Sequence, residues 1–309
     1  MKYPVLDGHC DTAVELWRKG ESLAKNSGQI SLAQAAEFPA YVQFFAFCTV
    51  WIKNAQTDEE RFASAMAYFS EQLREHNIPL CRTSADVSAI LQNGGVGAAL
   101  SIEGAEAFDC DPGRLEKLAA QGVRMIAPVW NAENALAGSC MTGGGLTAQG
   151  REFVRRAQRA GILVDVSHSS ERTFWDICEI AEKPIVASHS NAKAVCGHVR
   201  NLTDEQFRAI CDLGGTAGLN LYAPFLTQAP RASFDDLRRH LDRFLELDGE
   251  GHIALGADLD GCDLLPEGFS GLDDYNRLGD FLKTTGYSDE TIQNLFCNSL
   301  MKVVKLCIM

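Results

Sequence analysis

The stretch DGHCD near the start of the chain places His9 two residues before Asp11. It closes an apolar run with the composition of a strand, and alternate side chains of a strand point to the same face. We therefore expect His9 and Asp11 on one face and Cys10 on the other. An imidazole beside a carboxylate forms either a buried hydrogen-bonded pair or half of a metal site.

Four further residues of the same kinds close later apolar runs. They are Glu103 in SIEGAE, His168 in DVSHSS, His189 in VASHSNA and Asp258 in GADLDG. Three imidazoles with two or three carboxylates suit a pair of divalent ions, zinc above all, with manganese, cobalt or iron as substitutes. The pattern as a whole predicts that His9 and Asp11 are metal ligands.

This set of side chains indicates a hydrolytic chemistry. Glu103, placed between two ions, can bridge them. A water held by both ions becomes a hydroxide near neutral pH and attacks a carbonyl carbon. A carboxylate that is not a ligand, the role we assign to Asp258, can carry the proton to a leaving amine.

Strand-like apolar runs alternate with amphipathic stretches along the whole chain. We expect strands at 5–11, 41–50, 96–104, 123–131, 162–168, 184–190, 214–222 and 253–261. We expect helices at 58–76, 111–121, 149–160, 170–181, 203–213 and 233–247. Several of these helices begin with Ser, Thr or Asp at the N-cap position.

Eight strands with intervening helices predict a parallel (β/α)8 TIM barrel, with residues 1–309 as a single domain. A doubly wound open sheet is the alternative. Such barrels carry their chemistry at the carboxyl ends of the strands, where the six residues above stand. The stretch 20–38 and the glycine-rich stretch 138–145 are expected to be insertions at strand ends.

The composition narrows the class of protein. The net charge is −13 and no block is rich in Lys or Arg, so we expect neither nucleic acid nor an anionic membrane as a partner. No stretch reaches the roughly 18 apolar residues of a membrane span. Eleven cysteines without a Cys-x-x-Cys pair predict reduced, mostly buried thiols and a cytoplasmic location.

The motifs in this order resemble the membrane dipeptidase (renal dipeptidase) family, zinc peptidase family M19, in a soluble bacterial-type form. The resemblance runs from DGHCD through SIEGAE, DVSHSS and VASHSNAKAVCGHVRNLTDEQ to GADLDG. It implies a barrel of the metal-dependent amidohydrolase type. It also implies hydrolysis of free dipeptides, often with a D-residue accepted at the C-terminal position, and frequently a homodimer.

The resemblance also implies a role for each motif residue. By position, His9, Asp11 and Glu103 resemble the ligands of one zinc, and Glu103, His168 and His189 those of the other. Asp258 resembles the catalytic acid and base. Arg200, in HVRNLTDEQ, resembles the arginine that binds the substrate carboxylate, a role suited to a guanidinium, which can grip a carboxylate with two hydrogen bonds.

One position departs from the family pattern. Relatives commonly end the fourth strand in Thr-His-Asn, whose histidine helps to polarise the substrate, whereas APVWN places Trp130 there. An indole donates one hydrogen bond and accepts none, so carbonyl polarisation and substrate preference are in doubt. We expect Trp130 to line and narrow the substrate pocket, or the site to act on a different amide.

Several neighbouring residues compete for these roles. Glu106 is the alternative to Glu103 as the bridge, and Asp165 is expected to orient His168 rather than to bind metal. Asp260 is expected to be structural and His198 to lie at the surface or rim.

Two other functions stay open. One is a different amidohydrolase acting on a lactone, a phosphotriester or a cyclic amide, although such sites usually begin with His-x-His. The other is a non-catalytic binding barrel.

Overall fold

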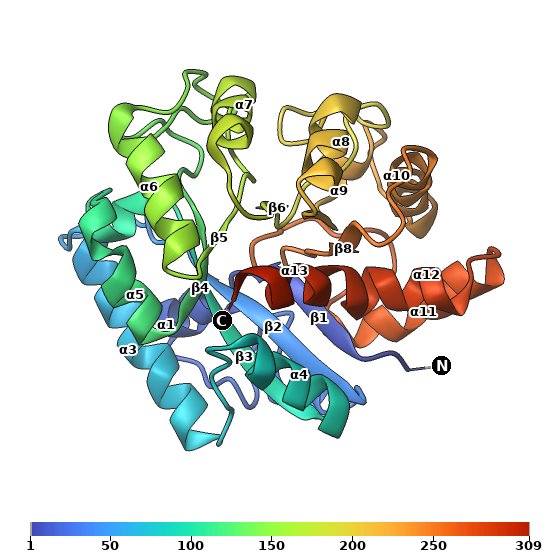
Figure 1. Cartoon of the computed structure of the whole chain (residues 1–309). Helices are drawn as coiled ribbons and strands as arrows, with labels where there is room; N and C mark the ends of the chain where they lie inside the picture. Colours follow the sequence, from blue (N-terminus) through green and yellow to red (C-terminus); the bar gives the residue numbers. More distant parts are fainter. Residues whose placement is uncertain (1, 309) are drawn as a thin grey trace.

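The computed structural model describes residues 2–308, which form one sheet of eight parallel strands ringed by helices (Figure 1). The strands are β1 (Val5–Cys10), β2 (Ala40–Phe47), β3 (Gly95–Glu103), β4 (Val123–Ala127), β5 (Leu163–Val164), β6 (Val186–Ala187), β7 (Thr216–Leu219) and β8 (Ile253–Leu255). They pair in the order β5-β4-β3-β2-β1-β8-β7-β6. All eight predicted strands are therefore present.

The two edges of this sheet meet between β5 and β6. Asp165 and Val186 form a parallel bridge, and the Val166 N–H donates to the Val186 carbonyl at 2.7 Å. The sheet is thus a nearly closed (β/α)8 barrel, as predicted, and the open doubly wound alternative is wrong.

The strands β5 and β6 are much shorter than predicted. The carboxylate of Asp165 replaces regular strand partners there, because its Oδ1 accepts the backbone N–H groups of both Ser167 and Ser188 at 2.9 Å. The segments that carry His168 and His189 therefore leave the sheet early, and side-chain hydrogen bonds hold them.

The six predicted helices are α3 (Asp58–Glu75), α5 (Leu115–Gln121), α6 (Ala148–Arg159), α7 (Glu171–Ile180), α8 (Asp204–Asp212) and α10 (Phe234–Glu246). The predicted 111–121 helix opens as a 3₁₀ turn, η2 (Pro112–Arg114). Capping boxes start α3 at Thr57 and α8 at Thr203, where the N-cap side chain and the third helical residue satisfy each other's backbone N–H.

The remaining elements were not predicted individually. They are α1 (Thr12–Lys19), α2 (Leu32–Ala35), α4 (Ser84–Asn93), η1 (Ala105–Phe108), α9 (Ala223–Leu226), η3 (Leu272–Asp274), α11 (Tyr275–Thr284), α12 (Asp289–Gln293), the π-helical segment η4 (Asn294–Asn298) and α13 (Ser299–Cys307). Of the helices in residues 2–308, none is both long and apolar enough to cross a membrane.

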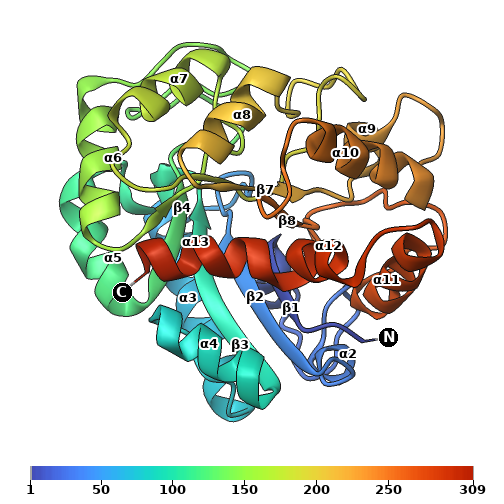
Figure 2. The same cartoon turned by 45° about the vertical axis from the view of Figure 1, so that its right-hand side comes forward.

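Helix α13 closes the amino-terminal end of the barrel and runs across the strands in Figures 1 and 2. Leu300, Val303 and Val304 pack on the apolar interior side chains of the barrel, among them Leu6 and Met125. The Ser299 carbonyl accepts from Thr216, the first residue of β7, at 3.3 Å. With one end of the barrel filled by apolar side chains, the carboxyl end is left for polar ones.

We expect Leu300→Ala to lower the free energy of unfolding by about 2–5 kcal/mol, because it opens a cavity in this closed end. Urea unfolding followed by circular dichroism measures the change. Leu306→Ala, on the same helix but 55% exposed, is the matched control and should change stability little. Equal effects of the two substitutions would contradict the packing role of α13.

Candidate metal centre

The carboxylate of Glu103, at the end of β3, lies at the centre of the converging side chains. It is 4% exposed. Its Oε1 lies 2.7 Å from His168 Nε2 and 3.3 Å from His189 Nε2. Its Oε2 lies 3.9 Å from His9 Nε2, and the His9 ring lies against that of His189, with centroids 3.9 Å apart. The two oxygens of one buried carboxylate thus address two groups of donor atoms.

The second group surrounds His9. Its Nε2 lies 3.5 Å from Asp11 Oδ2 and 3.7 Å from Asp258 Oδ1. As expected, Cys10 is directed into the apolar core instead. Asp11 falls just beyond β1, at the N-cap position of α1, yet its side chain makes no capping hydrogen bond. The carboxylate of Asp11 is therefore free to face the site.

The His168 and His189 rings are each fixed through their Nδ1 atoms. His168 Nδ1 lies 2.9 Å from Asn131 Oδ1, and His189 Nδ1 lies 2.7 Å from Ser188 Oγ, whose hydroxyl donates to Asp165. Because both partners accept from Nδ1–H, each Nε2 carries a lone pair. This is the usual way in which a protein orients a metal-binding histidine.

Three unprotonated acceptor atoms consequently meet in a buried space. The two Nε2 atoms are 3.1 Å apart, and both face Glu103 Oε1. Burial lowers the pKa of both imidazoles, and the charge of Arg200 lowers each further, which keeps them neutral. Lone pairs brought together in this way repel unless a cation lies among them.

The geometry fits divalent ions. Tetrahedral zinc, with ligands about 2.0–2.1 Å away, holds its donor atoms about 3.3–3.4 Å apart. The separations given above for these donor pairs bracket that spacing. In addition, His9 Nε2 is buried and has no hydrogen-bond partner within residues 2–308. A Cβ at Gly261 would collide with the carboxylates of Asp11 and Asp258, so glycine keeps this space open.

Proton equilibria follow from the excess of carboxylates. Burial alone would lower the pKa of His9, but Glu103, Asp11 and Asp258 outweigh it and raise that pKa to about 10. Burial raises the pKa of Asp11 to about 7.

Asp258 and Arg200 complete the site from opposite sides. Asn220 Nδ2 donates to Asp258 Oδ2 at 3.0 Å, which leaves Oδ1 toward His9. Arg200 is 6% exposed, and its Nη1 and Nη2 make long contacts, each 3.4 Å, to Ser190 Oγ and the His189 carbonyl. The Arg200 Nε is buried without a hydrogen-bond partner, and no carboxylate in the described chain pairs with this guanidinium.

These side chains line an open cavity of about 820 Å³ at the carboxyl end of the barrel. Trp130 lines it too, with its ring centroid 6.2 Å from that of His168. The predicted insertion 20–38 contributes Gln29, and the insertion 138–145 contributes Met141. Seven of the eight residues predicted for the site therefore line one cavity, and the ring of the eighth, His9, faces three of them, Asp11, Glu103 and Asp258.

The competing residues make other contacts. Glu106 is half-buried and lies outside the cavity lining, and Asp165 supports His189 through Ser188 rather than His168. Asp260 accepts from Thr12 and from the Gln29 backbone, which joins a loop to the barrel. His198 lies in the cavity wall with its ring against Phe225.

Sequence reasoning missed Asn131, Ser188 and Asn220, which orient the predicted site residues. Each follows a buried strand-like run directly, and that position was the available signal. Two predicted site residues, His168 and Asp258, have φ values of 67° and 61°. This left-handed conformation is strained for residues other than glycine and is common at functional sites.

Comparisons with known proteins show similarity along most of the chain. The profile of the family described as membrane dipeptidase (peptidase family M19) matches residues 1–307. An uncharacterised protein from the pqqA 5′ region of Klebsiella pneumoniae is 36% identical over 250 residues, covering 76% of this chain and 92% of that protein. An uncharacterised dipeptidase of Schizosaccharomyces pombe is 29% identical, covering 85% of this chain and 68% of that one.

Solved structures match along the whole length. A metallopeptidase from Rhodobacter sphaeroides, liganded with a phosphinate mimic of the dipeptide L-Ala-D-Ala, superposes with a TM-score of 0.89 at 26% identity, covering 99% of this chain and 100% of that one. A dipeptidase of family M19 superposes with a TM-score of 0.89 at 28% identity, covering 100% of this chain and 99% of that one.

We expect Ser188→Ala to weaken zinc binding by about 10–100-fold, because His189 loses the acceptor that fixes its tautomer. Competition with a chromophoric chelator measures the affinity. Ser101→Ala is the matched control, since Ser101 is a buried serine of β3 whose hydroxyl has no hydrogen-bond partner in the described residues. Unchanged affinity in Ser188→Ala would contradict the orienting role.

We also expect metal binding to release protons. The raised pKa of His9, about 10, means that the metal-free protein holds a proton there at pH 7.5, and a ligand must lose it. Affinity should therefore rise with pH, by about tenfold per unit above pH 7, and more steeply below pH 7 where Asp11 is also protonated. Calorimetry in two buffers of different ionisation enthalpy counts the protons. The matched control is His252→Gln, because His252 lies just before β8 and outside the cavity lining, and this variant should release as many protons as the unaltered protein. A proton count of zero would contradict the assignment of His9 as a metal ligand.

Proposed function

Because this chain belongs to the membrane dipeptidase family, peptidase family M19, we propose that it hydrolyses free dipeptides with two zinc ions and accepts a D-residue at the C-terminal position. Members of this family are metal-dependent dipeptidases, so the enzyme class is a metallopeptidase. The observation that carries the proposal is the buried carboxylate of Glu103 between two groups of donor atoms, with the unpaired guanidinium of Arg200 in the same cavity.

The two ions have separate ligands and one in common. His9, Asp11 and Glu103 would hold one, and Glu103, His168 and His189 the other. Ions held by these residues would supply Lewis acidity and would lower the pKa of a bound water to near neutrality. Asn131 orients the ring of His168, and the Asp165–Ser188 pair orients the ring of His189. Both Nε2 lone pairs are thereby kept directed into the site.

Arg200 binds the C-terminal carboxylate of the substrate. Its charge lies in the cavity wall without an acidic partner in residues 2–308, and a carboxylate would satisfy the nitrogen that lacks a hydrogen bond. The ring of Phe225, 5.6 Å from the guanidinium carbon, supports the side chain from one side. Binding at Arg200 fixes the position of the substrate in the open cavity, so that its peptide bond lies toward the metal ligands.

Asp258 moves the proton. Asn220 occupies its Oδ2, so Oδ1 is the atom that accepts a proton from the attacking water and gives it to the leaving amine. Trp130 lies beside His168 and narrows the cavity at the place where relatives carry a histidine. Acceptance of a D-residue is supported by the structural relative bound to the L-Ala-D-Ala mimic.

The test is hydrolysis of L-Ala-L-Ala, L-Ala-D-Ala, N-acetyl-L-Ala-D-Ala and L-Ala-D-Ala amide, with added zinc and after chelation. We expect zinc-dependent cleavage of the free dipeptides and at least about tenfold less of the amide. Arg200→Met should lower kcat/KM for L-Ala-D-Ala by about 10–150-fold, the value of a charge-assisted hydrogen bond. For L-Ala-D-Ala amide, whose kcat/KM is already low, the same substitution should cause little further loss. Arg208→Met, an exposed arginine of α8, is the matched control.

Failure to cleave any dipeptide while two zinc ions are bound would contradict the proposal. The alternative, another amidohydrolase-type reaction permitted by Trp130, would then be tested with lactones and cyclic amides.

A further inference from the structure

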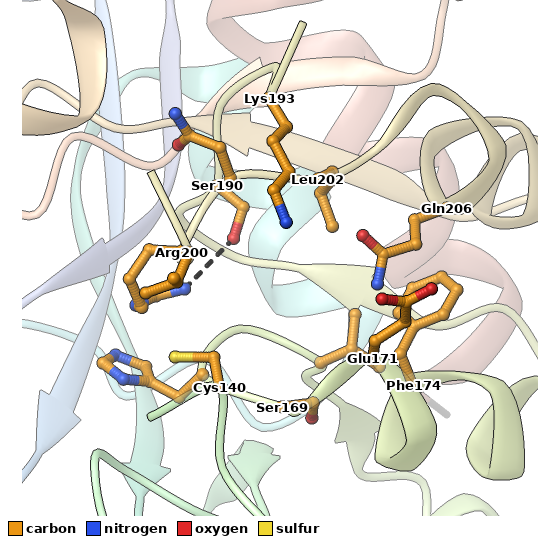
Figure 3. Close-up of a pocket in the computed structure, with 13 residues that line it drawn as sticks. Cys140, Ser169, Glu171, Phe174, Ser190, Lys193, Arg200, Leu202 and Gln206 are labelled. Atoms are coloured by element: carbon orange, nitrogen blue, oxygen red, sulfur yellow. Dashed lines mark hydrogen bonds between the residues drawn. The ribbon is translucent and has the colours of Figure 1, made fainter. Parts of the chain in front are cut away.

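A second, smaller cavity of about 150 Å³ adjoins the larger one (Figure 3). The two cavities share His168 and Arg200 as wall residues. The remaining wall comes from the start of α7, from the loop after β6 and from Gln206 at the start of α8. Arg200, the proposed carboxylate clamp, therefore separates the site from a further space.

Lys193 gives this smaller cavity its charge. In Figure 3 its side chain extends into the space, with the ammonium nitrogen between Ser190, Leu202 and Gln206. No hydrogen bond or ion pair satisfies that ammonium within residues 2–308. With Arg200, two cationic groups face a small space that is partly withdrawn from water.

The position of Lys193 is fixed by its backbone. Its N–H donates to the Leu202 carbonyl at 2.7 Å, and the Leu202 N–H donates to the Asn191 carbonyl at 2.8 Å. Asn201, the residue before Leu202, donates to the carbonyls of Cys196 and Phe225 at 2.8 Å each. The loop that carries both Lys193 and Arg200 is thus held at its two ends, which fixes the backbone positions of both residues.

Glu171 is the one acidic side chain among the described residues that line this cavity. It is exposed in the first turn of α7 and forms no ion pair with Lys193 or Arg200. The cationic charge of the cavity is therefore not neutralised from within, and an anion entering it would find two positive groups against one negative.

The substrate geometry connects the two cavities. When Arg200 holds the C-terminal carboxylate, the side chain of that same residue branches from the adjacent carbon. Since Arg200 lines both cavities, a group two or three bonds along this side chain would reach the entrance to the smaller cavity. A second carboxylate at that point would meet the ammonium of Lys193.

We propose that Lys193 makes the smaller cavity a subsite for an acidic side chain, so that dipeptides ending in aspartate or glutamate are the preferred substrates. This inference rests on the proposed dipeptidase function and specifies its substrate class. Lys193 acts as a specificity residue that contacts the substrate directly. Glu171 opposes it and limits the preference.

The test compares the acid with its isosteric amide. The ratio of kcat/KM for L-Ala-Asp over L-Ala-Asn is measured with both L- and D-configurations of the second residue. We expect a ratio of about ten or more in one configuration, as for a charge-assisted hydrogen bond. Lys193→Met should reduce it to about one, Lys193→Arg should keep most of it, and Glu171→Gln should raise it.

The matched control is Lys302→Met, on α13 at the opposite end of the barrel, which should leave the ratio unchanged. Zinc content and circular dichroism verify that each variant is folded and loaded. The preference should also decline as salt is added, because it is electrostatic.

Two results would overturn the inference. One is a ratio near one in the unaltered enzyme although L-Ala-D-Ala or L-Ala-L-Ala is cleaved, which would leave the dipeptidase function intact. The other is a ratio that survives Lys193→Met, which would assign the preference to Arg200 alone. Cleavage of no dipeptide at all would remove the proposed function and this inference together.

Discussion

The burial of one carboxylate between two groups of donor atoms is the constraint on which the site depends. Glu103 is almost fully buried, and each of its two oxygens faces a histidine nitrogen. Burying unprotonated acceptors together is costly unless a cation lies among them. Protons relieve this cost only at His9, which is held as a cation, since burial keeps His168 and His189 neutral. Metal ions among these donor atoms would resolve the rest of the conflict, and this requirement explains the side chains that support the site.

Those supports come from the barrel. Its amino end is filled by apolar side chains and closed by α13, which leaves the carboxyl end for polar side chains. There the regular ladder stops early, and Asp165 uses both oxygens to hold the segments of β5 and β6 that carry the two histidines. The backbone at His168 and Asp258 is left-handed. Such strain is tolerated at the site because the rigid core of the barrel surrounds it.

The sequence predicted the barrel and the six converging residues for a definite reason. A charged or imidazole side chain at the end of a buried apolar run has few structural explanations, and parallel strands bring such ends together. The lengths of β5 and β6 could not be predicted, because a side chain of Asp165, not the strand pattern, ends the pairing. Asn131 and Asn220 escaped notice because an amide beside a strand is ordinary until its partner is known. The role of Lys193 depends on a cavity made by three separate elements, which no local pattern describes.

Trp130 is the point where the chemistry of this chain must differ from that of relatives with a histidine. An indole cannot accept a proton or a hydrogen bond, so it cannot share the work of polarising a carbonyl in the way that an imidazole does. The six donor residues make no hydrogen bond to Trp130 within residues 2–308. Under the proposed function, we therefore expect the substitution to affect how the substrate is held rather than whether water is activated. Substrate positioning would then depend more on Arg200 and on the walls beside it, including the cavity that Lys193 enters.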